Sequence, residues 1–255
     1  MKSLLSLILL VGLFCCSSSF ASCSASSSST SFGSLSSFTL ASSAQLVESG
    51  TGFTCTGSLL SVLSTNTVTA TFASSTHTSG TTPRLYSSSA GSYIPYKLCG
   101  DSACSTTYSI GGSKTWSSTS LIGLLGLFNS SDGTLPLYLK TSSGVNVPAG
   151  TYTDTLTLSW SYKICFVGVL GICRYTSGTA TSTIAVTLIV TNDCAIDTAP
   201  DVNFGSAALP VDFSDVSSSL GVRCTSNASY KVSLASSNAT SGNWRQMSAT
   251  TTSGT

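Results

Sequence analysis

The sequence predicts an all-β protein, an immunoglobulin-like antiparallel β-sandwich followed by a second, truncated sandwich of the same kind. Three observations lead to this prediction. Apolar residues alternate with Ser and Thr in several segments, which is the period of a half-buried strand. No segment after residue 21 has a convincing 3.6-residue period, so no helices are expected there. A framework of cysteines and a Phe-Gly pair occurs twice along the chain.

The first 21 residues have the features of a secretory signal. Lys2 is followed by the apolar run 4–14, and small residues lead to a cleavage site after Ala21. A run of about eleven residues is too short to cross a bilayer, which needs roughly 20. We therefore expect an exported protein whose mature chain begins at Ser22.

The repeated framework divides the mature chain into two modules. Its positions are Cys23, Phe32-Gly33 and Cys55, and then Cys194, Phe204-Gly205 and Cys224, with Thr after the second cysteine each time. The first module is expected over residues 22–191 and the second over residues 192–255. A sandwich of this kind needs roughly 100 residues. The second module is therefore expected to be partial, as in a fragment of a two-domain protein or a truncated product.

The clearest strand is predicted over residues 151–162, where Tyr152, Leu158 and Trp160 share one face and Thr or Ser fills the other. The next strand repeats the pattern from Ile184 to Val190. Earlier strands are expected before Phe32-Gly33, around Cys55, and over residues 68–72, 93–98 and 135–139. In an up-and-down order, the connections after the second, fourth and sixth strands emerge at one end.

Eight cysteines follow the predicted signal, an even number that predicts four disulfides in an oxidising compartment. Two pairs lie close in sequence and would each close a short loop, and the framework cysteines pair within each module. The predicted disulfides are Cys23–Cys55, Cys99–Cys104, Cys165–Cys173 and Cys194–Cys224. Cys99–Cys104 is expected to brace the base of the loop that precedes the 135–139 strand.

The segment VPAGTYTDTLTLSWSY at residues 147–162, with the Cys, Phe-Gly, Cys-Thr framework, resembles the spore coat protein U domain family. This family supplies subunits of archaic, Csu-type chaperone-usher pili. The resemblance implies a pilin sandwich that lacks one strand until an adjacent pilin subunit donates it, because a missing strand exposes core and backbone groups. It also implies a periplasmic chaperone and an outer-membrane usher as assembly partners, and a bacterial protein exported through the periplasm to the cell surface.

Cys23 lies so close to the expected cleavage site that we expect no N-terminal donor strand. A subunit that accepts a strand and donates none is confined to the end of a fibre. Two such modules resemble the two-domain tip adhesin of these pili. In that arrangement residues 22–191 form the binding domain, and residues 192–255 form a partial pilin-like domain that joins the shaft.

Three apolar inserts distinguish the first module. LIGLLGL at 121–127 matches FVGVLGI at 166–172 position by position, and LLSVL lies at 59–63. Exposed apolar patches mark interaction sites, although each insert could instead be an ordinary buried strand. The inserts resemble the hydrophobic fingers of the Csu-type tip adhesin, which implies attachment to hydrophobic abiotic or host surfaces and a role in biofilm formation. The predicted surface-binding residues are Leu59, Leu60, Val62, Leu63, Leu121, Ile122, Leu124, Leu125, Leu127, Phe128, Phe166, Val167, Val169, Leu170 and Ile172.

Other functions have weaker support in the sequence. Charged residues are 7% of the chain and the net charge is +1, so no nucleic-acid surface is expected. His77 is the only histidine, Asp101 and Asp132 lack an obvious carboxylate partner, and the cysteines have no zinc spacing, so neither an enzyme nor a metal or cofactor site is expected. Asp154 is expected to accept hydrogen bonds from the backbone or a turn.

Two alternatives remain open at this point. A glycan-binding tip lectin could stack a sugar on aromatic side chains, for which the candidates are Trp116, Tyr108, Tyr93 and Tyr96. A structural pilin or spore-coat-like subunit would instead serve in a shaft or coat.

Overall fold

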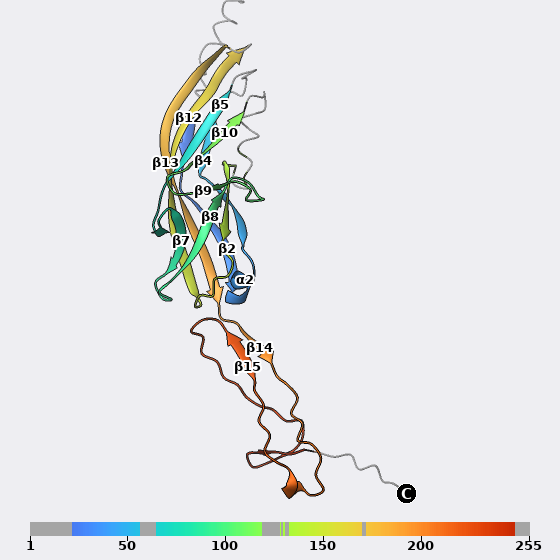
Figure 1. Ribbon diagram of the computed structural model, residues 1–255. Coiled ribbons are helices and arrows are strands. Elements are labelled where there is room, and N and C mark those ends of the chain that lie inside the picture. The colour runs from blue at the N-terminus through green and yellow to red at the C-terminus, as the bar shows by residue number, and fades with distance from the viewer. Residues whose placement is uncertain are drawn as a thin grey trace, which may run out of the picture.

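The structure is a computed structural model that describes residues 22–56, 65–118, 128, 130, 133–169 and 172–247. The predicted signal, residues 1–21, lies outside them. The described chain is almost entirely β (Figure 1), which confirms the predicted all-β, immunoglobulin-type fold class. No described helix is long and apolar enough to cross a membrane.

The first sandwich contains most of the strands. Its elements are β1 (Ser22–Ala25), β2 (Ser28–Ser36), α2 (Ser37–Ser42), β3 (Leu46–Gly50), β4 (Phe53–Thr56), β5 (Asn66–Ser75), β6 (Thr78–Ser79), β7 (Thr82–Ser87), β8 (Ser92–Cys99), β9 (Thr107–Tyr108), β10 (Ser113–Ser118), β11 (Pro136–Thr141), β12 (Gly150–Val169) and β13 (Ile172–Thr191). The second part contains β14 (Cys194–Thr198), η1 (Pro210–Asp212), β15 (Gly221–Cys224), β16 (Thr240–Ser241) and β17 (Trp244–Arg245).

One face of the sandwich is built from β10, β5, β12, β13 and β2, and the other from β7, β8, β11 and β3. All neighbouring strands are antiparallel except β2, which runs parallel to β13. The two faces are joined by hydrogen bonding between β12 and β7 at Thr153 and Tyr86. At the other side, the Ser28 hydroxyl donates to the Gly50 carbonyl across 2.8 Å and ties β2 to β3.

The predicted period of two is the packing pattern of the long strands. Along β12, Tyr152, Leu156, Leu158 and Trp160 are buried, and the Thr and Ser residues between them are more exposed. The β13 strand buries its alternate residues in the same way from Ser182 to Val190. These side chains form one core with the inward faces of β5, β8 and β11. Each long strand packs one of its faces into the core. The alternation of apolar and polar residues in the sequence therefore predicted which side chains are buried.

The expectation of no helix was wrong at α2. The Ser36 hydroxyl accepts a hydrogen bond from the Thr39 amide and caps this six-residue helix, and Leu40 is fully buried. A helix this short cannot display a 3.6-residue period. A strand was expected to end before Phe32-Gly33, but both residues lie inside β2. Gly33 has a φ of 79° at a register shift against β13, where glycine avoids backbone strain.

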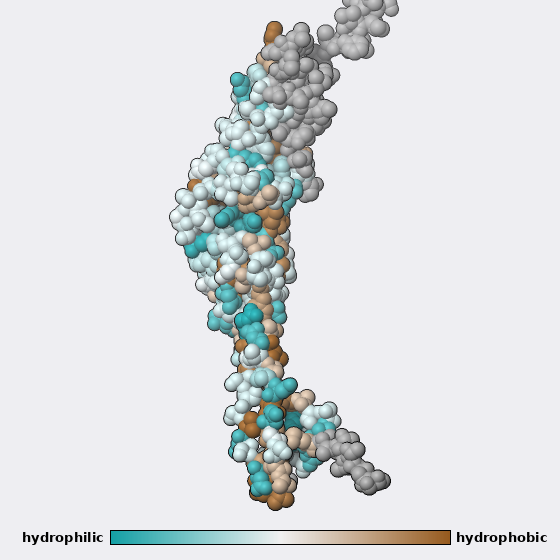
Figure 2. Space-filling view, turned by 45° about the vertical axis from the view of Figure 1, so that its right-hand side comes forward, coloured by the Kyte–Doolittle hydropathy of each residue, from teal (hydrophilic) through white to brown (hydrophobic). Residues whose placement is uncertain are grey.

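The second part, residues 192–247, leaves the lower end of the sandwich in Figure 1 and has only short strand pairs, β14 with β15 and β16 with β17. Many of its apolar side chains are exposed, and brown patches lie over this part in Figure 2. The exposed residues are Ile196, Val202, Phe204, Leu209, Val211, Phe213, Val216, Leu220, Tyr230, Val232, Leu234, Trp244 and Met247. The described residues of this part therefore do not close a core of their own.

Candidate functional site: the loop pole and the apolar strip

Described strand ends next to each of the three apolar inserts lie at one end of the first sandwich, which we call the loop pole. It is defined by Asn66 at the start of β5, Ser118 at the end of β10, and the hairpin of β12 and β13 beyond Lys163. Ser118 pairs with Asn66, and Lys163 pairs with the adjacent Thr67, so these strand ends are neighbours. All of them lie at the upper end of Figure 1.

The predicted tips themselves are only partly within the described residues. The insert residues Leu59, Leu60, Val62, Leu63, Leu121, Ile122, Leu124, Leu125, Leu127 and Leu170 lie outside them. Phe166, Val167 and Val169 are described as backbone in β12. Ile172 is described fully and is 82% exposed. The roles of these residues in binding remain predictions.

The insert between Cys165 and Cys173 is the end of a long hairpin. β12 and β13 each have 20 residues. The last pair between β12 and β5 is Lys163 with Thr67, and pairing with β13 continues to Val169 with Ile172. A two-stranded ribbon therefore projects beyond the sheet, with a register shift between Cys165 and Val167. Such a ribbon is marginally stable by itself.

Two features fix the base of this ribbon. The Cys165–Cys173 disulfide joins its strands, and the backbone amide of Cys165 donates to the side-chain oxygen of Asn66 across 2.7 Å. Asn66 is only 1% exposed. The sequence analysis missed Asn66 because a lone asparagine in a Thr-rich segment carries no special signal.

The core beneath the loop pole is aromatic. Phe53 stacks on Trp160 with ring centroids 4.5 Å apart, and Trp116 lies 5.9 Å from Trp160. Phe128, which was predicted to contact a surface, is half-buried with its ring centroid 6.5 Å from Phe53. Its contact with the core places it at the base of the 121–127 insert.

The ribbon carries a cation and an aromatic ring that the sequence analysis did not single out. The Lys163 ammonium lies 4.5 Å from the centroid of the Tyr175 ring, and Tyr175 is exposed. This cation–π contact covers part of the ribbon face. Lys163 and Tyr175 lie in a Ser- and Thr-rich segment, where nothing in the sequence indicates that they contact each other.

The structure contains the four disulfide pairs named from the sequence. Cys99–Cys104 closes the turn between β8 and β9, and Cys99 is opposite Tyr138 near the start of β11. Lys114, at the start of β10, donates to the Gly100 carbonyl beside this disulfide. The bracing of the 121–127 insert stays a prediction, because the insert lies outside the described residues.

Asp101 holds the same turn together. Its carboxylate accepts hydrogen bonds from the Ser105 hydroxyl at 2.6 Å, the Ser105 amide at 3.0 Å and the Thr106 amide at 3.2 Å. These bonds, the Ser105 hydroxyl foremost, lower the pKa of Asp101 to about 2. Asp101 therefore has a structural role in this turn.

Asp154 is almost completely buried and serves as an acceptor. Its carboxylate accepts from the Ser75 and Tyr96 hydroxyls, both at 2.6 Å, and from the His77 amide at 3.1 Å. The imidazole nitrogen Nδ1 of His77 lies 3.7 Å away. Burial, followed by the charge of Asp154, raises the pKa of Tyr96. The network joins β5, β8 and β12.

The aromatic residues considered for a lectin lie in different places. Tyr96 and Trp116 are buried in the core. Tyr108 is half-buried against Phe72, with ring centroids 5.4 Å apart. Tyr93 is exposed, with the Arg84 guanidinium 4.1 Å from its ring centroid. The four rings therefore do not form a single sugar-stacking face.

Asp132 lies outside the described residues. Within the described ranges, no three His, Cys, Asp or Glu side chains are grouped so that they could hold a metal ion.

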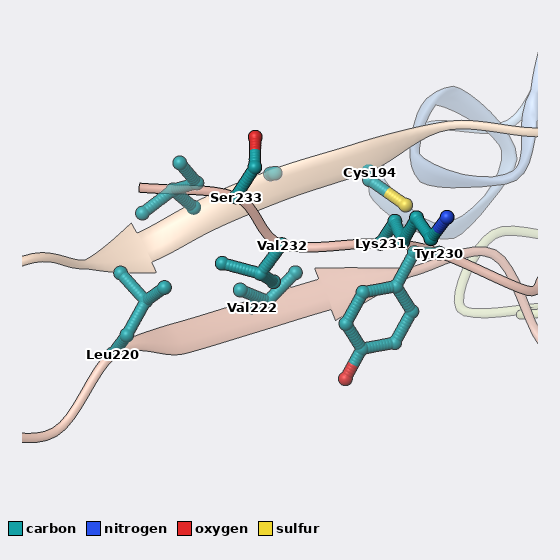
Figure 3. Close-up of a pocket in the computed structure, with 9 residues that line it drawn as sticks. Cys194, Leu220, Val222, Tyr230, Lys231, Val232 and Ser233 are labelled. Carbon is teal, nitrogen blue, oxygen red and sulfur yellow. The ribbon is translucent and has the colours of Figure 1, made fainter. Parts of the chain in front are cut away.

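The second part contributes a different kind of surface, which we call the apolar strip. A hollow of about 260 Å³ is lined by Ile196, Leu220, Val222, Tyr230 and Val232 (Figure 3). A second hollow, of about 490 Å³, shares Leu220 and Val232 with the first and continues to Val202 and Leu234. The two hollows are therefore adjacent. Such a strip could bind an extended segment with alternate apolar side chains.

Comparisons with known proteins support the family and the fold of the chain. Residues 13–159 and 180–255 match the Spore Coat Protein U domain. The fold is similar to a chain in the crystal structure of the CsuC–CsuE chaperone–tip adhesion subunit pre-assembly complex, from archaic chaperone-usher Csu pili of Acinetobacter baumannii. That match has 27% identity and a TM-score of 0.54, and it covers 81% of this chain and 72% of the other. No curated protein matches the sequence.

Proposed function

The chain belongs to the spore coat protein U domain family, and we propose that it is the tip adhesin of a chaperone-usher pilus, which attaches cells to apolar surfaces through the loop pole. The family and the structural likeness support a chaperone-usher pilus subunit. The observation that carries the finer proposal is the common origin of three apolar inserts at the loop pole.

The loop pole suits a surface without a defined chemistry. Burying one large apolar side chain contributes about 1.5 to 3 kcal/mol. Several side chains engaged together exceed the cost of immobilising the tip by a modest margin. Because many pili act on one cell, weak contacts multiply into firm attachment. The braced ribbon supports this proposal because a tip held away from the sandwich cannot fold back onto its own core.

The apolar strip supports the second half of the proposal. In this proposal, residues 22–191 form the binding domain, and residues 192–255 belong to a pilin-like domain that an adjacent subunit completes with a donor strand. A periplasmic chaperone would cover the same strip before the usher assembles the fibre at the cell surface. Residues 22–25 are already paired with β4 through Cys23–Cys55, so this segment is not free to serve as a donor.

The test is adhesion of piliated cells to polystyrene. We expect the triple change Leu124→Ser, Leu125→Ser and Val169→Ser to abolish most attachment, and mild detergent to compete with the native protein. The matched control changes Leu46→Ser and Ile189→Ser, which are exposed apolar residues outside the loop pole, and should attach normally. Unchanged adhesion of the triple variant at equal piliation would refute a hydrophobic loop pole.

The same assay separates a glycan-binding tip from an apolar one. Soluble sugars that block attachment, where detergent does not, would favour the lectin alternative.

A further inference from the structure

A groove on the side of the first sandwich has a chemistry different from that of the loop pole. Two adjacent hollows, of about 270 and 150 Å³, share the wall residues Lys97, Thr107 and Ser142. Together we call them the lysine groove. Its walls come from β8, β9 and the end of β11, and they include Lys140, Thr141 and Ser143.

The two lysines face each other without an acidic partner. Lys97 on β8 and Lys140 on β11 are directly opposite in the antiparallel register. Like charges at this position destabilise a sheet. The ion pairs found among the described residues are His77–Asp154 and Arg223–Asp197, so neither lysine takes part in one. In a chain with 10 Lys and Arg residues, two placed together at a cost to stability indicate an anionic ligand.

Two acidic groups lie near the groove. The carboxylate of Asp101 accepts its three hydrogen bonds from Ser105 and Thr106 within its own turn. Glu48 lies on β3 opposite Tyr138, and burial of the Tyr138 hydroxyl, followed by the charge of Glu48, raises the pKa of Tyr138. Among the described residues, neither carboxylate forms an ion pair with Lys97 or Lys140.

The far end of the groove is suited to a sugar ring. Its walls combine Pro83 and the half-buried ring of Tyr108 with the hydroxyl side chains of Thr82 and Ser109. An aromatic ring offers an apolar face, and hydroxyl groups donate and accept hydrogen bonds. An inorganic anion would contact Lys97 and Lys140 and would make no contact with Pro83 or Tyr108.

We propose that the lysine groove binds an acidic saccharide, with a carboxylate or sulfate at Lys97 and Lys140 and a sugar ring against Tyr108. The groove lies away from the loop pole. Lys140 is near the end of β11, and Leu135, just before β11, donates its amide to Phe53 beneath the loop pole. The protein could then hold an acidic matrix polysaccharide at its side while the loop pole contacts a surface.

The experiment measures binding of tetragalacturonate to the full mature chain by titration calorimetry at low ionic strength. We expect Lys97→Gln with Lys140→Gln to weaken binding roughly tenfold, and added salt to weaken it in the native protein. Lys97→Arg with Lys140→Arg keeps the charge and should retain binding. Lys163→Gln, at the loop pole, removes an unrelated lysine and serves as the matched control.

Two further arms identify the ligand class. Inorganic phosphate and the methyl-esterified, neutral tetrasaccharide should both bind at least tenfold more weakly than tetragalacturonate. Tyr108→Leu should weaken the saccharide and leave phosphate unchanged. Equal affinity for phosphate, or saccharide binding that survives the double glutamine change, would overturn the proposal. The loop-pole triple variant leaves the lysine groove intact and should bind tetragalacturonate normally. Failure of saccharide binding is therefore distinguishable from failure of adhesion to polystyrene.

Discussion

At the scale of single residues, Asp154 shows how a polar chain with few charges uses one of them. Asp154 is 3% exposed, and a buried charge is costly unless donors surround it. Ser75 on β5, His77 in the turn after β5 and Tyr96 on β8 of the opposite face supply those donors. The sequence predicted Asp154 as an acceptor, although the two hydroxyl donors could not be identified before the strands were placed.

The first prediction concerns Tyr96→Phe. Hydrogen bonds to charged groups contribute about 1.5–3 kcal/mol, so the variant should lose this much stability at pH 7. The pKa of Tyr96 is raised in the folded protein above its ordinary value of 10.0. The folded state therefore keeps a proton that the unfolded chain releases, and the stabilisation by Tyr96 decreases as the pH rises above about 10. Urea unfolding from pH 7 to 11 should show the two stability curves converging above pH 10.

Tyr152→Phe is the matched control for this experiment. The Tyr152 hydroxyl donates to the neutral Pro148 carbonyl across 2.7 Å, so its loss should cost only about 0.5–1.5 kcal/mol at pH 7. An equal loss in both variants would mean that the Asp154 charge adds nothing to the Tyr96 bond.

At the scale of elements, the long strands with a sustained alternating pattern were predictable from the sequence, and the shorter elements were not. β12 and β13 were recognisable because alternation continues over many residues with one face buried. β10 was missed because its six residues, SKTWSS, bury little besides Trp116. The meeting of Asn66 with Cys165 depends on long-range pairing, which no local pattern reveals.

The second prediction concerns Asn66→Ala. The change leaves the buried amide of Cys165 without its acceptor, which costs about 1–3 kcal/mol. Because this bond anchors the ribbon, hydrogen exchange of the Cys165 amide should accelerate while amides in the centre of β12 remain protected. Thr67→Ala, one residue along β5, is the control. Unchanged protection at Cys165 would show that the disulfide alone fixes the ribbon.

The third prediction compares two disulfides of similar span. Removing Cys165–Cys173 by Ser substitution should lower stability by up to about 2.5 kcal/mol, by the loop-closure estimate, and reduce attachment to polystyrene. Removing Cys99–Cys104 should also lower stability but leave attachment intact, because this disulfide closes the turn between β8 and β9 and does not join the strands of the ribbon. Equal attachment by both variants at equal piliation would mean that bracing the ribbon is unnecessary.

At the scale of the whole molecule, the proposed tip adhesin would have to transmit a pull from the loop pole to its second part. The two parts of the chain are joined by the linker at Asn192 and by a buried contact. The Ser37 hydroxyl, at the start of α2, lies 2.8 Å from the Thr225 hydroxyl, and both side chains are buried. The Asp193 amide donates to the same Thr225 oxygen across 2.8 Å. The short helix that the sequence did not predict therefore contributes to the junction.

The last prediction tests whether this junction holds the two parts in a fixed orientation. Thr225→Val leaves the buried Ser37 hydroxyl without its partner, at a cost of about 1–3 kcal/mol, and removes the acceptor of the Asp193 amide. The contacts that then remain between the parts are weak and exposed, namely the Arg223 guanidinium 4.6 Å from the Phe38 ring centroid and the Ser226 amide 3.4 Å from the Asn146 side-chain oxygen, so we expect the parts to reorient. Small-angle scattering should then show a broader distribution of lengths, and protease should cut more rapidly at residues 191–193. Ser42→Ala, exposed on the same helix, should change neither. Identical scattering and cleavage for Thr225→Val would mean that the linker alone sets the orientation, and that a pull on the loop pole reaches the shaft through a hinge.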